Sequence, residues 1–432
     1  MKRHSLVLLA CVLLASCAAP PEPQPPEPGL TPSGAGVQPE RPLVVPPLSA
    51  LPETPPRALA GRFVKAGWGE LPGWNADDMS QLWSTIVGNC RGLMRPVPAS
   101  LTAPARAAPR DWQPFCAAVA DPAKAPVAAN AEGVRQFLRE HLQPWRLAAP
   151  NGAPAANTVT GYYEPLLRGS RRQGGLYQWP LYAVPGDLLT IDLGGVYPEL
   201  AGKRVRGKLD GKRVVPYDTR AEIESGGRRP PVLVWIDDPV DAFFMQVQGS
   251  GRVLLTDGPD AGKTIRLAYA DHNGQPYVSI GRWLADRGEL PLAQASMQNI
   301  RLWARRNPQR VQEMLNANPA VVFFREEPVT DPEAGPRGAY GLPLTPRRSI
   351  AVDTAFVPLG ALVYLSTTWP ASDRPLNRLV FAQDTGAAIK GAARADFYWG
   401  FGDNAGEQAG RMKQRGQMWV LWPRQAGVPA AR

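Results

Sequence analysis

The sequence of 432 residues predicts an α+β protein that is mainly β, with its strands curled into barrel cores. Short apolar or alternating runs recur along the chain, and glycine or proline interrupts them at short intervals. This pattern is typical of strands curled into barrels, and it disfavours parallel sheets joined by crossover helices. Apolar residues at helical spacing occur in only a few segments. The length is sufficient for two folded domains.

The first residues predict a lipoprotein signal peptide over 1–16. Lys2 and Arg3 precede an apolar run, and small residues precede Cys17, as in bacterial lipoproteins that are cut before an acylated cysteine. The alternative is an ordinary secretory leader with an incidental cysteine. Ala18 follows in place of an aspartate, which implies sorting to the outer membrane. Residues 17–57 are crowded with proline and predict a lipidated, semi-rigid tether.

Three segments of the body predict helices. They extend from Ala76 to Leu93 with Asp77 and Asp78 as caps, from Asn130 to near Pro144, and from Ser296 to Leu315. The clearest strand-like runs are residues 232–236, 243–248, 253–255, 361–365 and 418–421. No run after the leader is long enough to span a bilayer.

Cys90 and Cys116 are the two cysteines left for the folded body, since Cys11 lies in the leader and Cys17 is the lipidation site. In an oxidising periplasm they could form one disulfide. Two buried free thiols remain the alternative.

The net charge of +10 favours contact with nucleic acid, anionic lipid or acidic cell-wall polymer, and the alternative is a generally basic proteome in which the charge means little. The basic residues are scattered, so no arm or helix predicts nucleic-acid binding. With only His4, His141 and His272, a histidine triad or zinc site lacks partners, and we expect no metal and no cofactor.

Carboxylates are the remaining candidates for chemistry. Asp384 follows a short apolar run and precedes Thr385-Gly386, and Asp396 precedes Phe397-Tyr398-Trp399. Aromatic neighbours would desolvate Asp396 and raise its pKa above the ordinary value of about 3.9, as a general acid requires. A nearby Asp384 charge would act in the same direction. On spacing alone, both residues could equally be turn caps or surface groups.

Several motifs together resemble the membrane-bound lytic transglycosylase A (MltA) family, whose C-terminal module is named for three aspartates. These motifs occur along the chain in the same order as in the family, and they cover roughly residues 60 to 425. The matching segments are Thr160-Gly161-Tyr162-Tyr163-Glu164-Pro165, residues 219–223, residues 244–251, residues 273–277, residues 322–325, and Ser349-Ile350-Ala351-Val352-Asp353 with the two later aspartate segments.

The resemblance implies a double-psi β-barrel domain from residues 58–165 plus 327–432, with N-terminal helices and the three-aspartate module. It implies a second, smaller β-barrel domain inserted over residues 166–326, with the glycan in the groove between them. The variable region from Val184 to Lys212 leaves the edge of the inserted domain open.

For chemistry, the resemblance implies a carbon–oxygen lyase that cleaves peptidoglycan between N-acetylmuramic acid and N-acetylglucosamine and leaves 1,6-anhydromuramoyl ends. Asp396 would act as acid and then as base, and Asp384 would tune it. The expected substrate-binding residues are Thr160, Tyr162, Tyr163, Glu164, Gln248, Gly249, Ser250, Gly251, Asp353 and Lys390. The expected partners are glycan strands, outer-membrane lipid through Cys17 at the periplasmic face, and other cell-wall enzymes.

Three alternatives remain open. A hydrolytic muramidase would act on the same substrate, and a non-catalytic lipoprotein would bind the wall without products. An aspartic protease is the third, because Asp384-Thr385-Gly386 matches the start of that signature. Such proteases need two facing copies, and this chain has one.

Overall fold

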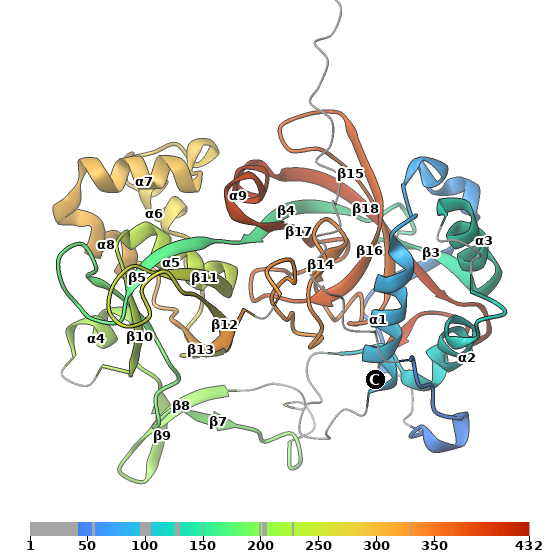
Figure 1. Cartoon of the computed structure of the whole chain (residues 1–432), viewed down its shortest axis with the longest axis horizontal. Coiled ribbons are helices and arrows are strands. Elements are labelled where there is room, and N and C mark those ends of the chain that lie inside the picture. Colours follow the sequence, from blue (N-terminus) through green and yellow to red (C-terminus); the bar gives the residue numbers. More distant parts are fainter. Residues whose placement is uncertain are drawn as a thin grey trace, which may run out of the picture. The chain divides into compact units, whose positions relative to one another are not determined.

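The computed structural model describes residues 42–53, 57–95, 105–125, 130–149, 151–197, 200, 205–226, 229–329 and 331–431 (Figure 1). The predicted signal peptide, Cys17 and most of the predicted tether lie outside these residues. Among the helices that the structure describes, none is both long and apolar enough to cross a membrane.

The fold is mixed α+β and mainly β, as predicted. The largest sheet has eight strands in the order β15-β16-β14-β17-β4-β18-β3-β2, and an additional pairing between β15 and β18 joins six of them into a closed ring. Its strands are β2 (Arg62–Lys65), β3 (Leu142–Ala148), β4 (Ala156–Glu164), β14 (Ser349–Val352), β15 (Leu362–Thr368), β16 (Pro375–Asp384), β17 (Ala395–Phe401) and β18 (Lys413–Pro423).

A second sheet of six strands has the order β13-β12-β11-β5-β10-β6. The two edge strands of this sheet are β6 and β13. A single β-bridge joins Ala183, the residue after β6, to Phe324 of β13. Its strands are β5 (Leu166–Ser170), β6 (Trp179–Tyr182), β10 (Val232–Ile236), β11 (Ser250–Leu255), β12 (Thr264–His272) and β13 (Val322–Pro328). The chain passes from the ring into this sheet at Pro165, between β4 and β5, and leaves it after β13.

Two smaller sheets complete the β structure of the described residues. β7 (Leu189–Ile191), β8 (Val205–Asp210) and β9 (Arg213–Pro216) form an antiparallel sheet, and β1 (Arg57–Ala58) pairs with β19 (Ala430–Ala431).

The helices lie before the ring strands, within the segment of the second sheet, and between β17 and β18. They are α1 (Leu82–Met94), α2 (Pro109–Ala120), α3 (Ala131–His141), α4 (Arg220–Ser225), α5 (Pro239–Gln248), α6 (Ile280–Asp286), α7 (Met297–Arg306), α8 (Val311–Asn316) and α9 (Gly402–Arg411). Short 3-10 turns occur at Leu48–Ala50, Trp68–Glu70, Trp74–Ala76, Leu292–Gln294, Pro308–Arg310 and Arg424–Ala426.

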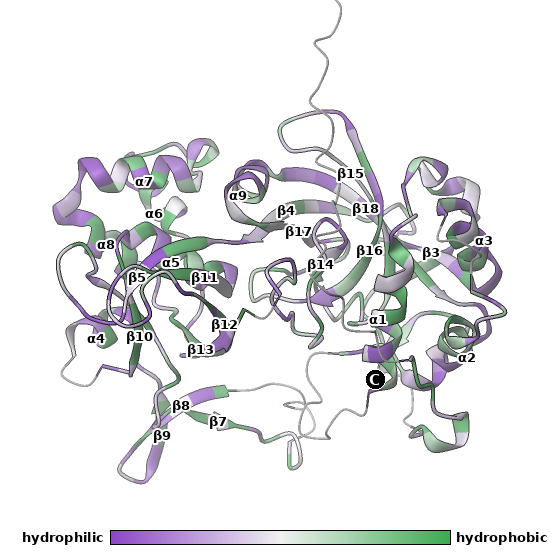
Figure 2. Cartoon of the chain, in the orientation of Figure 1, coloured by the Kyte–Doolittle hydropathy of each residue, from purple (hydrophilic) through white to green (hydrophobic). Residues whose placement is uncertain are grey.

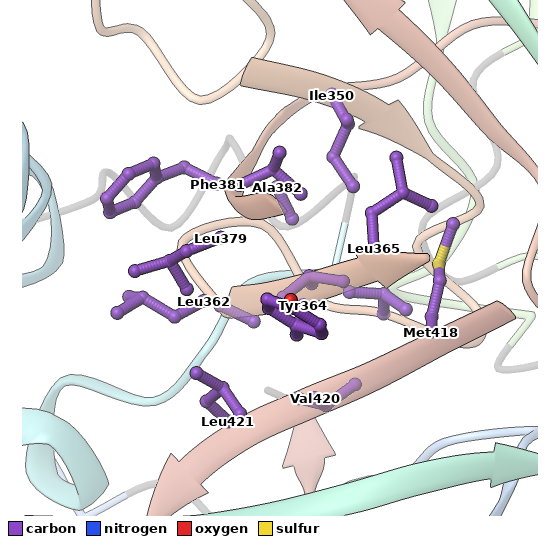
Figure 3. Packing of buried hydrophobic residues seen from close by; sticks show 14 of the residues in the cluster. Ile350, Leu362, Tyr364, Leu365, Leu379, Phe381, Ala382, Met418, Val420 and Leu421 are labelled. Carbon is purple, nitrogen blue, oxygen red and sulfur yellow. The ribbon is translucent and has the colours of Figure 1, made fainter. Parts of the chain in front are cut away.

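The hydrophobic cores follow the two larger sheets. In the ring, buried side chains of β14, β15, β16 and β18 pack together, and Figure 3 shows this packing. The labelled residues are Ile350, Leu362, Tyr364, Leu365, Leu379, Phe381, Ala382, Met418, Val420 and Leu421. A separate cluster lies along β5, β10, β11 and β12, and another joins α5 to α6, α7 and α8. In Figure 2, α3 and α7 carry both hydrophilic and hydrophobic residues, as expected for helices with one buried face.

The predicted strand at residues 243–248 is wrong, because these residues belong to helix α5. Asp238 accepts hydrogen bonds from the backbone N–H groups of Val240 and Asp241, Pro239 occupies the first turn, and Gly249 ends the helix with a φ of 80°. Phe243 and Met245 are buried in different apolar clusters, so apolar residues occur on more than one face and obscure the helical period.

The predicted first helix begins later than expected, at Leu82, and Asp77 does not cap it. Asp77 is instead buried, where its Oδ2 accepts hydrogen bonds from Arg348 Nη1 at 2.9 Å and from the Leu379 N–H at 2.8 Å.

The predicted helix from Ser296 to Leu315 is two helices, α7 and α8, because Pro308 lacks the N–H that an uninterrupted helix needs. The helix predicted from Asn130 is confirmed, with Asn130 as its cap.

Candidate active site

Asp396 is held on the ring by strands that are distant in sequence. β17 pairs in parallel with β4, which places Asp396 opposite Thr160, and it pairs antiparallel with β14. The Thr160 hydroxyl donates a hydrogen bond to Asp396 Oδ1 at 2.7 Å. Because side chains alternate along a strand, Phe397 and Trp399 enter the ring core while Asp396 points to the other side.

Burial raises the pKa of Asp396 to about 6, and the negative charge of Asp384 acts in the same direction. The Thr160 hydrogen bond and the positive charge of Arg394 oppose this rise. The direction agrees with the one predicted from the sequence. A carboxyl group with such a pKa is partly protonated and partly ionised near neutral pH, so it can both donate and accept a proton.

Asp384 lies at the end of β16 and accepts three hydrogen bonds. Its Oδ1 accepts from the backbone N–H groups of Ala339 and Thr385, both at 2.9 Å, and its Oδ2 accepts from the Tyr162 hydroxyl at 3.1 Å. Burial raises the pKa of Asp384, and these three donors lower it. Asp384 is therefore a fixed neighbour of Asp396.

Asp353 follows β14 and is buried. Its Oδ1 accepts from the Ala355 N–H at 3.1 Å, and its Oδ2 accepts from the Gly391 N–H at 2.8 Å. The Gly391 bond ties the loop between β16 and β17 to the end of β14. Lys390 is in the same loop and is exposed. The structure thus gives Asp353 a role in holding the loop that presents Lys390.

Tyr162 and Tyr163 point to opposite sides of β4. Tyr162 is buried against Tyr398, with ring centroids 5.2 Å apart, and burial raises its pKa well above the ordinary value. The Tyr163 N–H donates to Gln248 Oε1 at 3.1 Å, which links β4 to α5. The Tyr163 ring lines a cavity of about 540 Å³ whose lining includes neither Asp384 nor Asp396.

Glu164, which is predicted to bind substrate, has a side chain that is completely buried between two arginines. Its carboxylate accepts from Arg252 Nε at 3.0 Å and from Arg266 Nε at 2.6 Å. Both guanidinium groups also donate to the Ala334 carbonyl, in the segment that follows β13. This buried cluster connects the end of β4 to β11, β12 and that segment.

Gly249 and Gly251, which are predicted substrate-binding residues, each meet a local structural requirement. Gly249 adopts the left-handed conformation that ends α5. Gly251 is buried, and a Cβ there would lie 2.7 Å from Met245 and 3.0 Å from Pro165. Ser250, between them, begins β11 and is partly exposed.

Cys90 and Cys116 form a disulfide that joins α1 to α2 across 26 residues. Within the described part of the chain, no three His, Cys, Asp or Glu side chains converge as a metal site would require. His272 ends β12, where its Nδ1 accepts from the Gly274 N–H.

Sequence reasoning missed Arg394, although it lies only two residues before Asp396. Its Nη2 donates to Thr160 Oγ1 at 2.9 Å, and its Nη1 donates to the Thr158 carbonyl at 3.1 Å and to the Ala395 carbonyl. A basic residue so close to a candidate acid was the available signal.

The fold and the site define a class of α+β proteins that hold a partly buried carboxyl group of raised pKa on a closed ring of strands. Two family models match the chain: the MltA specific insert domain over residues 158–325, and the 3D domain over residues 348–422.

A membrane-bound lytic murein transglycosylase A of Escherichia coli (strain K12) is 34% identical over 301 residues, which are 68% of this chain and 72% of the relative. The crystal structure of MltA from Neisseria gonorrhoeae is similar with a TM-score of 0.69 and 35% identity, covering 91% of this chain and 99% of that one. E. coli MltA with bound chitohexaose is similar with a TM-score of 0.58 and 25% identity, covering 88% and 97%. The chain belongs to the membrane-bound lytic murein transglycosylase A family.

Proposed function

We propose that this protein is a peptidoglycan lytic transglycosylase in which Asp396 transfers the protons. The observation that carries the proposal is the partly buried Asp396 carboxyl group, with a pKa of about 6, held by Thr160 and raised further by the charge of Asp384. The curated relatives are named lytic murein transglycosylases, and a related structure contains chitohexaose, a glycan oligomer.

In the first step, neutral Asp396 donates its proton to the oxygen that links N-acetylmuramic acid to N-acetylglucosamine. At pH 7, a carboxyl group with a pKa of about 6 is protonated in about one molecule in ten. An ordinary aspartate with a pKa of about 3.9 is protonated in about one in a thousand. Burial therefore raises the population of the acid form by about a hundredfold.

In the second step, the Asp396 carboxylate accepts the proton of the muramoyl C6 hydroxyl, whose oxygen attacks C1 of the same sugar. The C6–O oxygen bonds to C1 as the bond from C1 to the leaving oxygen breaks, so a 1,6-anhydro ring forms and no water is consumed. The nucleophile belongs to the substrate itself, so it is already held at high effective concentration.

The surroundings of Asp384 favour this scheme over hydrolysis. A hydrolytic glycosidase needs a second carboxylate, either to attack the sugar or to activate water. Asp384 accepts three hydrogen bonds, from Ala339, Thr385 and Tyr162, which hold both of its oxygens. A single carboxyl group that serves first as acid and then as base is consistent with this arrangement.

We assign glycan binding to side chains that remain partly exposed near the site. Tyr163, Gln248 and Ser250 would contact sugar rings from the end of β4 and the α5–β11 turn. Lys390 would contact a substrate oxygen from the loop that Asp353 holds. Thr160 and Tyr162 would act on the two aspartates and not on the sugar.

We also propose the predicted domain organisation. Residues 58–165 plus 327–432 would form a double-psi β-barrel domain, which the closed ring of six strands supports. Residues 166–326 would form an inserted barrel, supported by the six-stranded sheet and the bridge between Ala183 and Phe324. The glycan would lie in a groove between these domains.

For location, we propose a lipid anchor at Cys17 and attachment to the periplasmic face of the outer membrane through the tether of residues 17–57. The relatives are named membrane-bound, which supports membrane association. Other cell-wall enzymes are proposed as partners, as the family resemblance implies.

The test compares wild-type protein with Asp396→Asn on purified sacculi. Wild type should release anhydromuropeptides, and the variant should release none while keeping its circular dichroism spectrum. Mass spectrometry separates the alternatives, because a hydrolytic muramidase adds one water to each product and a non-catalytic binder gives no product. Full activity of Asp396→Asn would refute the role of Asp396.

A further inference from the structure

Arg394, Thr160 and Asp396 form a chain of hydrogen bonds with a fixed direction. Arg394 Nη2 lies 2.9 Å from Thr160 Oγ1, and Thr160 Oγ1 lies 2.7 Å from Asp396 Oδ1. A guanidinium group can only donate, so Thr160 Oγ1 accepts from Arg394. A threonine hydroxyl has a single proton to give, and Asp396 Oδ1 is the acceptor within reach.

The direction of this chain has a consequence for the carboxyl group. Asp396 Oδ1 accepts the hydrogen bond from the Thr160 hydroxyl. The acid proton of Asp396 is therefore less stable on Oδ1 than on Oδ2. If Oδ1 carried the acid proton and donated it to Thr160, the threonine oxygen would accept twice, and its own proton would lose this acceptor. Arg394 already donates a charge-assisted hydrogen bond to Thr160 Oγ1. This bond disfavours a second donor to the same threonine oxygen.

We propose that Arg394 is a positioning residue: through Thr160 it keeps the transferable proton of Asp396 on Oδ2 and stabilises the carboxylate that remains after transfer. This inference rests on the proposed function. It adds that one oxygen of Asp396 performs both the acid and the base step, while the other is held by the protein.

Arg394 is itself held by the two strands that carry its partners. Nη1 donates to the Thr158 carbonyl of β4 at 3.1 Å and to the Ala395 carbonyl of β17. Its side chain is only partly exposed, and burial lowers its pKa while the charge of Asp396 raises it. These bonds keep the guanidinium directed at Thr160.

The other titratable groups near Asp396 come from several elements. Asp384 on β16 raises the pKa of Asp396, and Tyr162 on β4 donates to Asp384. Further titratable groups on the elements around Asp396 are Tyr398 on β17, Asp353 after β14, exposed Lys390 in the β16–β17 loop, and exposed Lys413, which pairs with Thr160 across β18 and β4. Arg394 is the cation among these groups that contributes to the pKa of Asp396.

The experiment measures initial rates of anhydromuropeptide release from purified sacculi between pH 4 and pH 9, at low substrate concentration. The variants are Arg394→Met, Arg394→Lys, Thr160→Val and the double variant Arg394→Met/Thr160→Val. Arg306→Met is the matched control, because Arg306 is exposed at the end of α7, outside the strands that hold Asp396, and its loss also removes one positive charge.

In Arg394→Met, the alkaline limb of kcat/KM should move upward by about one pH unit, because an opposite charge that lowered the pKa of Asp396 is gone. The rate at the acid plateau should fall about tenfold, because the proton is no longer directed to Oδ2. Arg394→Lys keeps the charge and should keep the limb near its wild-type position. The control should match wild type in both respects.

The double variant tests whether Arg394 acts through Thr160. Its plateau rate should equal that of Thr160→Val, because the effects of residues in one chain of hydrogen bonds are not additive. A partly unfolded variant loses amplitude at every pH and leaves the limb in place, so misfolding cannot produce the expected shift.

Two results would overturn the inference: an unshifted limb in Arg394→Met, or plateau losses that multiply fully in the double variant. Absence of anhydro products from the wild-type protein would instead refute the proposed function, so the two failures are distinguishable.

Discussion

Replacing Asp396 by asparagine should stabilise the protein at alkaline pH and leave its stability unchanged at acidic pH. The folded protein raises the pKa of Asp396 from 3.8 to about 6, so folding favours the neutral form. The stability gained from this preference is complete below about pH 4, and it is lost as the pH rises through 6. The amide of asparagine stays neutral at every pH, and its oxygen can still accept the Thr160 hydrogen bond.

The expected magnitude follows from the size of the pKa shift. A shift of about two units corresponds to about 3 kcal/mol, since each unit is about 1.4 kcal/mol. Asp396 is partly exposed, so water screens the charge and this figure is an upper bound. At pH 8 the variant should therefore be more stable than wild type by about 1 to 3 kcal/mol, and at pH 4 by no more than about 0.5 kcal/mol.

Urea unfolding followed by circular dichroism at pH 4, 6 and 8 measures the difference. Asp403→Asn is the control, because Asp403 is exposed at the start of α9 and its replacement also removes one negative charge. That control should change stability by a similar amount at all three pH values. A raised pKa of Asp396 in the folded protein is refuted if Asp396→Asn is no more stable than wild type at pH 8, or if its advantage is the same at pH 4.

Two further predictions concern stability away from Asp396. Glu164→Gln should destabilise the protein by about 3 to 5 kcal/mol in urea unfolding, because Arg252 and Arg266 lose the carboxylate that neutralises them in a buried site. A variant as stable as wild type would contradict this. Replacing Cys90 and Cys116 together by serine should lower stability by about 3 kcal/mol, as expected for opening a loop of 26 residues. Adding a reductant should reproduce the loss in wild type and have no effect on the double variant.

The secondary structure shows where local sequence was sufficient. The helix that begins after Asn130 was predicted because its cap and its apolar spacing are both local. The segment 243–248 was misassigned because α5 is buried on more than one face, so the apolar residues do not reveal the period. Asp77 had the position of a helix cap, but Arg348, which lies 271 residues away, binds it instead.

The sequence by itself determined the fold class, the family resemblance and the identity of the two candidate aspartates. Aromatic neighbours also predicted the direction in which the pKa of Asp396 moves. The roles of residues around the aspartates were not readable from the sequence. Glu164 was expected to bind substrate, and nothing in the sequence indicated that two arginines enclose its side chain.

Only the tertiary structure decided what surrounds Asp396. Thr160 and Asp396 are 236 residues apart, and they meet because β4 and β17 pair in parallel in one register. A shift of one residue would turn each side chain to the opposite face of its strand. The sequence therefore identified the Asp396 carboxyl group. The pairing of the strands placed the Thr160 hydroxyl and the Arg394 guanidinium beside it and buried it, and these contacts set its pKa. They depend on segments that are distant in sequence, so the sequence alone did not reveal them.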